Sequence, residues 1–185
     1  MDLKNLAIIR QQFAQCVFNH KIHEKAADRI SKYCGYIKIS NIIVWCISFL
    51  LLILWFIFPN IRYLSYIASW IAIFEIMFSF IQKEFPFEDM VQNHKNIAIQ
   101  YLWLRDKYKN LIADIMNNSI KAEIISERRN QLQEQYQIIC SLSPNTAWKD
   151  YKNTQLVLLW KEKTDEEFTR SEKEINRFLP NNLHI

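Results

Sequence analysis

Two long apolar segments, joined by a very short linker, constrain the fold of this chain more than any other feature. Between Lys38 and Arg62 the sequence runs for 23 residues without a charge, and from Arg62 to Lys83 the only charged residue is Glu75. As a helix rising about 1.5 Å per residue, each segment is long enough to cross a hydrocarbon layer about 30 Å thick. The linker at 59–62 has room only for a tight turn. The sequence therefore predicts a transmembrane helical hairpin.

The predicted spans, at about 39–58 and 63–82, divide the chain into three parts. We expect residues 1–38 to form a cytoplasmic helix leading into the membrane, residues 39–84 the hairpin, and residues 85–185 a cytoplasmic helical bundle. One glycine and four prolines in the whole chain supply little material for the turns of a β-sheet. The predicted fold class is therefore all-α, as a homo-oligomeric membrane protein.

Basic residues flank the predicted hairpin on one side. Those before the first span or after the second are Lys21, Lys25, Arg29, Lys32, Lys38, Lys83 and Lys95. The linker holds only Arg62. The positive-inside rule then predicts that both termini are cytoplasmic. No apolar stretch typical of a cleavable signal peptide precedes Lys38, so we expect the first span to direct its own insertion.

Outside the hairpin, apolar residues recur at helical spacing. We expect residues 2–38 to form one helix that continues into the first span, and Pro86 to separate the second span from a new helix beginning near Glu88. Six apolar residues of that new helix alternate at steps of four and three, which makes a heptad seam that needs partner helices. They are Ile97, Tyr101, Leu104, Tyr108, Leu111 and Ile115.

Two serines mark expected helix starts farther along the chain. Ser119 is a good N-cap for a second bundle helix, and Ser143, followed by a proline at the first helical position, for a third. We expect this third helix at about 146–178. The seam should pack against both of these helices.

The second span has one small, polar face. On a helical projection five residues fall within an arc of about 100° that includes Glu75, namely Ser65, Ala68, Ala72, Ser79 and Gln82. This stripe can line a water-filled path in which Glu75 attracts cations. It can equally allow close helix packing, with Glu75 hydrogen-bonded across the interface. Both alternatives need further copies of the chain, because a two-helix hairpin can neither enclose a lumen nor fully shield Glu75.

The residue types of common catalytic sites are largely missing. Gly35 is the only glycine, so neither a P-loop nor a dinucleotide-binding fingerprint can be built. His20 and His23 are expected to form an exposed polar pair rather than a metal site. We therefore expect no enzyme activity, no metal and no cofactor.

Cysteine spacing argues against a disulfide or zinc framework, and the distribution of charge argues against a protein that binds duplex nucleic acid. The cysteines lack CxxC spacing and are expected to be small buried hydrophobes in a reducing compartment; they are Cys16, Cys34, Cys46 and Cys140. The net charge of +4 is spread along the chain without a run of like charges, which argues against binding to duplex nucleic acid.

Short motifs behind and before the hairpin carry a family resemblance. They are His23 followed by Ala26-Ala27, Tyr-Leu-Trp-Leu-Arg at 101–105, Arg128-Arg129-x-x-Leu132, and Ser-Pro-Asn-Thr at 143–146. In this order, around two spans with a minimal loop, they resemble the SLATT family, the two-helix membrane effectors of bacterial nucleotide-signalling conflict systems. The resemblance covers about residues 10–160.

The resemblance implies an effector in the bacterial inner membrane that forms an oligomeric ion channel or pore and depolarises the infected cell in anti-phage defence. It also implies gating by a nucleotide or short oligonucleotide messenger, made by a partner nucleotidyltransferase. We take a tetramer as the working stoichiometry. A non-conducting, membrane-anchored scaffold that recruits partners through its coiled-coil-like cytoplasmic helices remains the alternative.

Three arginines are the candidate ligand-binding residues. Arg128 lies on the apolar stripe of its predicted helix, where it must pair either with a carboxylate, such as Asp106 or Asp114, or with a phosphate. Together with Arg129 and Arg105 it is expected to hold the messenger.

Overall fold

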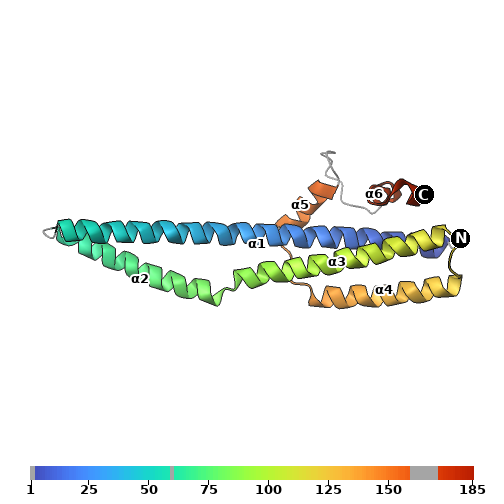
Figure 1. Cartoon of the computed structure of the whole chain (residues 1–185), viewed down its shortest axis with the longest axis horizontal. Helices are drawn as coiled ribbons and strands as arrows, with labels where there is room; N and C mark the ends of the chain where they lie inside the picture. Colours follow the sequence, from blue (N-terminus) through green and yellow to red (C-terminus); the bar gives the residue numbers. More distant parts are fainter. Residues whose placement is uncertain (1–2, 59–60, 159–170) are drawn as a thin grey trace. The chain divides into compact units, whose positions relative to one another are not determined.

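The computed structural model describes residues 3–58, 61–158 and 171–185, and these contain helices and no strand. The helices are α1 (Leu3–Ile57), α2 (Arg62–Glu84), α3 (Phe87–Met116), α4 (Ala122–Leu142), α5 (Trp148–Leu158) and α6 (Glu172–Asn176), followed by a 3₁₀ helix, η1 (Asn181–Leu183) (Figure 1). The all-α prediction is confirmed for the described residues.

The chain divides into two compact units. We call Met1–Asp28 together with Gln92–Ile185 the bundle unit, and Arg29–Val91 the hairpin unit. Helix α1 contributes to both, since its N-terminal half belongs to the bundle unit and the remainder to the hairpin unit.

Helix α1 is one unbroken helix of 55 residues, which confirms the predicted continuation into the first span (Figure 1). It contains no proline, and its single glycine, Gly35, has open space around the position of a Cβ atom. At the other end of the hairpin unit, α2 ends at Glu84 and α3 begins at Phe87, directly after Pro86. This is one residue from the predicted start at Glu88.

The heptad seam of α3 forms the centre of the bundle unit. All six of its residues are buried. Around them pack the N-terminal part of α1, with Leu6, Ile9 and Phe13, and three apolar residues of α4. Helix α4 runs back along α3 (Figure 1), as shown by the contacts Arg128–Asp114 and Lys107–Gln135. The seam thus finds partners within its own chain, and α1 supplies more of them than the sequence suggested.

The prediction that Ser119 caps α4 is wrong. Asn118 takes a left-handed conformation with φ of 51°, and Ser119 closes α3 by donating from its backbone N–H (3.0 Å) and its hydroxyl (2.8 Å) to the carbonyl of Asp114. This is a Schellman-type helix end, in which asparagine can replace glycine. Helix α4 begins only after Lys121.

The prediction that Ser143 caps the third bundle helix is also wrong. Ser143 is the C-cap of α4, and its hydroxyl donates to the carbonyl of Ile139 at 2.7 Å. Helix α5 starts five residues farther along, where the backbone N–H of Ala147 donates to the carboxylate of Asp150 at 3.0 Å. The Ser143 hydroxyl therefore binds the end of α4 and does not cap the start of α5.

The expected single helix over 146–178 is wrong in its extent. Ser171 is extended (ψ 156°) and starts α6 with a capping box, in which Glu174 accepts the N–H of Ser171. The middle of the expected helix, residues 159–170, lies outside the described residues.

Arg10 holds residues 171–185, which we call the C-terminal segment, against the N-terminal part of α1. Its side chain is completely buried and donates to the carboxylate of Glu172 (2.8 and 3.0 Å), to the carbonyl of Leu183 (2.7 Å) and to the side chain of Asn176. A buried guanidinium is tolerated only when its donors are satisfied in this way. Nothing in the spacing of the sequence indicated this contact.

Candidate functional site

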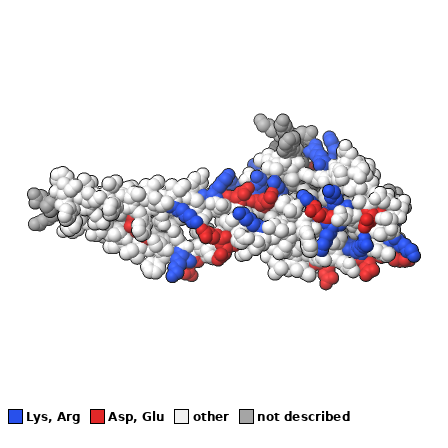
Figure 2. Space-filling view, in the orientation of Figure 1, with Lys and Arg blue, Asp and Glu red and all other residues white. Residues whose placement is uncertain are grey.

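The hairpin unit exposes a large apolar surface. Phe56 is 84% exposed and Trp70 73% exposed. Each of the two helical segments contains a stretch of 18 residues that is long and apolar enough to cross a membrane. In the first stretch 0% of the residues are buried, and in the second 6%. Figure 2 shows that Lys, Arg, Asp and Glu gather over the bundle unit and are scarce on the hairpin. Apolar surface of this size is typical of contact with lipid or with other subunits, not of the core helix of a water-soluble protein.

Polar contacts join the two arms of the hairpin unit at three levels. Ser48 of α1 donates to the Glu75 carboxylate at 2.9 Å, and Asn41 donates to the side-chain carbonyl of Gln82 at 3.0 Å. The third contact is the ion pair Lys38–Glu88. Within the apolar part, Glu75 and the side-chain carbonyl of Gln82 therefore each accept a hydrogen bond from the other arm, which reduces the cost of placing them in low-dielectric surroundings.

The small, polar stripe of α2 lines two hollows. The first, of ≈ 330 Å³, is lined by Ser65, Ala68, Ala72 and Glu75, together with Ser48 and three other residues. The second, of ≈ 460 Å³, is lined by Ala72, Glu75 and Ser79 among others. Five of the six expected pore-lining residues thus adjoin open space, and the half-buried Glu75 borders both hollows.

The structure contains features of both alternatives for Glu75, which are close helix packing and a water-filled path. Ala68 is buried within the hairpin unit and Glu75 has a hydrogen-bond partner there, which is what helix packing requires. The hollows beside the carboxylate are what a hydrated path requires. Ser48 was missed from the sequence, although it is the one hydroxyl in the middle of the first span and could have been noted for that reason.

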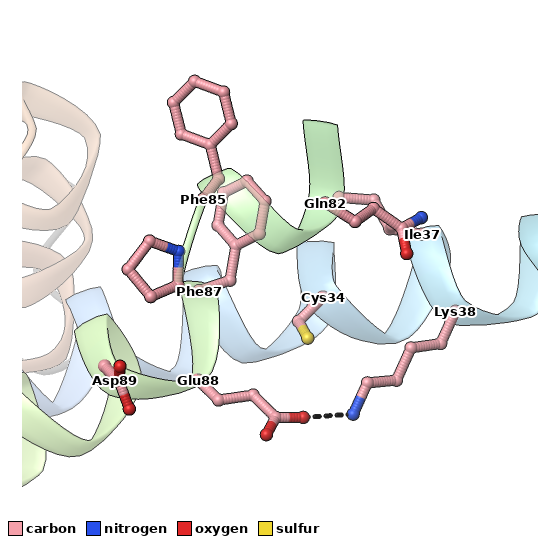
Figure 3. A pocket seen from close by; sticks show the side chains of 9 residues that line it. Cys34, Ile37, Lys38, Gln82, Phe85, Phe87, Glu88 and Asp89 are labelled. Carbon is pink, nitrogen blue, oxygen red and sulfur yellow. Dashed lines mark hydrogen bonds and ion pairs between the residues drawn. The ribbon is translucent and has the colours of Figure 1, made fainter. Parts of the chain in front are cut away.

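A third pocket lies at the junction of α2 and α3 (Figure 3). It measures ≈ 280 Å³ and is lined by Gln82, the sixth expected pore residue, together with Cys34, Lys38, Glu88 and both phenylalanines around Pro86. The rings of Phe85 and Phe87 stack with centroids 6.0 Å apart. The hydrogen bond to Glu88 raises the pKa of Lys38, and the same bond lowers that of Glu88. Among the described residues, the amide nitrogen of Gln82 has no hydrogen-bond partner.

The three candidate arginines do not converge. Arg128 pairs with Asp114 at 2.9 Å on the surface, so the internal salt bridge is the alternative that this structure contains. Arg129 donates to Asn5 and to Asn130. Arg105 pairs with its neighbour Asp106 and lines a groove that neither of the other two arginines lines.

That groove lies within the bundle unit and measures ≈ 710 Å³. Its lining contains the basic side chains His20, Lys21, Arg105 and Arg177 and the apolar side chains Val17, Val157, Leu158 and Phe178. Among the residues that the structure describes, no carboxylate side chain lines it. Four segments that are far apart in the sequence meet here: α1, α3, the end of α5 and the residues that follow α6.

Two histidines form a buried pair in the bundle unit, which corrects the expectation that His23 is exposed. The Nδ1 atoms of His23 and His94 are 3.0 Å apart, and the His23 ring stacks on Tyr101. Burial, and next the neighbouring His94, lower the pKa of His23 to about 4, while Asp150 acts in the opposite direction. In the described part of the chain, no group of three or more His, Cys, Asp or Glu residues could hold a metal ion.

The cysteines differ from the expectation in part. All four are free thiols, but only Cys16 is buried, whereas Cys46 and Cys140 are exposed. Cys46 lies in the apolar part of α1. Burial raises the pKa of the Cys16 thiol far above its ordinary value, which disfavours the thiolate that reacts as a nucleophile.

Comparison with known families gives one assignment. The model of SMODS and SLOG-associating 2TM effector domain family 4 matches residues 6–174. No curated protein and no solved structure matches the chain. The match covers both arms of the hairpin, the bundle helices and the start of α6.

Proposed function

The chain belongs to family 4 of the SMODS and SLOG-associating two-transmembrane effector domains, and from this we propose that it conducts ions across the bacterial inner membrane when its oligomer opens. Opening depolarises the infected cell. Both termini face the cytoplasm, so the bundle unit meets the signal. A nucleotide or short oligonucleotide made by a partner nucleotidyltransferase controls the opening.

The observation that carries this proposal is the environment of Glu75. A carboxylate within an apolar span is costly and usually marks an ion path or a relay. Here it accepts a hydrogen bond from Ser48 and borders two hollows lined by small residues. Assembly of several hairpins around these hollows would enclose them, and Ser65, Ala68, Ala72, Ser79 and Gln82 would share the lining with Glu75.

The test is membrane potential in living cells. Full-length protein is expressed alone and together with the neighbouring nucleotide-making enzyme, and a voltage-sensitive dye reports depolarisation. We expect depolarisation that depends on the effector and increases with the messenger. An intact potential in cells with verified membrane insertion and an active partner enzyme would contradict conduction.

The second candidate function is a non-conducting scaffold. The observation in its favour is the exposed apolar surface of the bundle unit, where Trp103, Leu142 and Trp148 are between 64% and 73% exposed. Exposed aromatic residues are enriched at protein interfaces. A scaffold would recruit partners through this surface without changing the membrane potential, so the same dye experiment separates the two functions.

A further inference from the structure

The basic groove of the bundle unit has the composition of a nucleotide-binding site. Its volume of ≈ 710 Å³ lies within the range of about 300–1,000 Å³ that is usual for ligand pockets. Basic side chains line it beside apolar ones, so it offers both charge and a dry surface. An anionic ligand with a flat apolar part satisfies both halves of such a lining.

Two of the basic side chains, Lys21 and Arg105, already have carboxylate partners. Lys21 pairs with Glu24 at 2.6 Å, and Arg105 pairs with Asp106 at 2.8 Å, both in partly exposed positions. Such pairs contribute little to stability, so a phosphate can share or replace the carboxylate. His20 donates from Nδ1 to the carbonyl of Ala98 (2.9 Å), because a carbonyl only accepts, and this fixes the orientation of its ring.

The wall of the groove is anchored to α1. Arg177 and Phe178 directly follow α6, and Arg10 holds both ends of that helix through Glu172 and Asn176. Arg10 lies on the same face of α1 as Val17 and Lys21, at helical spacing. A ligand in the groove would therefore add a second link between α1 and the C-terminal segment. Helix α1 continues without a break into the first span.

We propose that this groove binds the phosphate-bearing nucleotide that controls the effector, with Lys21, Arg105 and Arg177 contacting phosphates and Phe178 contacting the base. This site rests on the messenger-gated function proposed above. It retains Arg105 from the sequence prediction, replaces Arg128 and Arg129 by residues of α1 and of the C-terminal segment, and gives that segment a role in sensing.

Binding to the purified full-length protein in detergent tests the site. The probes are ATP, cyclic di-AMP and linear triadenylate, with inorganic pyrophosphate and a polyglutamate peptide as controls. We expect one of the nucleotides to bind, and Arg177→Gln or Arg105→Gln to weaken its binding at least tenfold while the thermal unfolding temperature stays unchanged. Arg128→Gln is the matched control, since Arg128 lies outside the groove, and should leave the affinity unchanged.

A second readout follows the C-terminal segment. Hydrogen exchange at residues 171–183 should slow when the nucleotide binds to wild type, and should not change in Arg177→Gln. The groove is refuted as a nucleotide site if no nucleotide binds, if pyrophosphate or the peptide binds as well as any nucleotide, or if Arg128→Gln weakens binding as much as Arg177→Gln.

The outcomes for the groove and for conduction are separable. If the wild type depolarises cells but binds none of the probes, the groove proposal fails and conduction stands. If a nucleotide binds with the expected dependence on Arg105 and Arg177 but the protein never depolarises cells, the groove proposal stands and the conducting function fails.

Discussion

At the scale of single residues, two buried polar side chains, Arg10 and His23, contact partners that are far away in the sequence. Arg10 reaches 162 residues along the chain to Glu172, and His23 meets His94 over 71 residues. Neither contact follows from local periodicity, because a buried polar group is identified by its partner and not by its own position. Glu75 could be identified as a candidate functional residue from the sequence because the residues around it are apolar.

The Arg10 contacts predict a local loss of stability when Glu172 is removed. Glu172→Ala deprives the buried guanidinium of its only charged partner among the described residues, at a cost of about 1.5–3 kcal/mol, which is typical of hydrogen bonds to charged groups. We expect faster hydrogen exchange at residues 172–183. Lys173→Ala, on the same short helix, is the control. Equal exchange in the two variants would show that Arg10 does not hold this segment.

The His23 environment predicts a pH dependence of stability. Its pKa is lowered from 6.5 to about 4 in the folded protein, so between these values the unfolded state binds a proton that the folded state does not. The free energy of unfolding is therefore undiminished above pH 6.5 and falls toward pH 4, by at most about 1.4 kcal/mol per pH unit.

Thermal unfolding in detergent, followed by circular dichroism at pH 7 and pH 5, measures this dependence. His23→Gln should reduce the difference between the two pH values, while His184→Gln should leave it as in wild type. If His23→Gln and wild type lose equal stability on acidification, the buried histidine pair is not the source.

At the scale of helices, periodicity predicted well and caps predicted poorly. The seam of α3 and the continuity of α1 follow from regular spacing of apolar residues over many turns, so many residues support each inference. The starts of α4 and α5 depended on single serines. Because a hydroxyl can close the preceding helix as readily as it can start the next one, Ser119 and Ser143 were assigned to the wrong helix.

Of the candidate functional sites, the one on a single regular helix was predictable from the sequence and the one built from several segments was not. The stripe around Glu75 was predictable because α2 is one regular helix, and the structure places open space beside it. The groove was not predictable, because its lining comes from four segments whose meeting depends on how the bundle packs. Of the three arginines singled out by sequence, only Arg105 lines it.

The seam predicts a large effect from one truncation. Leu104 is 2% exposed at the centre of the core, and Leu104→Ala should lower the free energy of unfolding by about 2–5 kcal/mol through lost burial and a cavity. Asn110→Ala, at an exposed position of the same helix, should change it by less than about 0.5 kcal/mol. Thermal unfolding in detergent compares the two. Similar unfolding temperatures would mean that the seam is not the core.

At the scale of the whole molecule, the hairpin unit leaves most of its large apolar side chains exposed. In the proposed assembly, lipid and further copies of the chain would cover this surface, and the two hollows beside Glu75 would be enclosed. The seam of α3 is already filled by helices of the same chain, so the proposed assembly would use other surfaces. The spans and the exposed tryptophans of the bundle unit are the surfaces left for it.

Ion flux through liposomes containing the purified full-length protein tests the central claim most directly. Wild type should dissipate a potassium diffusion potential in the presence of its nucleotide. Glu75→Gln should assemble and conduct with reduced preference for cations, and Glu75→Leu should assemble and not conduct. Ile73→Leu, an exposed apolar change on the same helix, should behave as wild type. Flux through Glu75→Leu at the wild-type rate would contradict the account, since the ion path would then not pass Glu75.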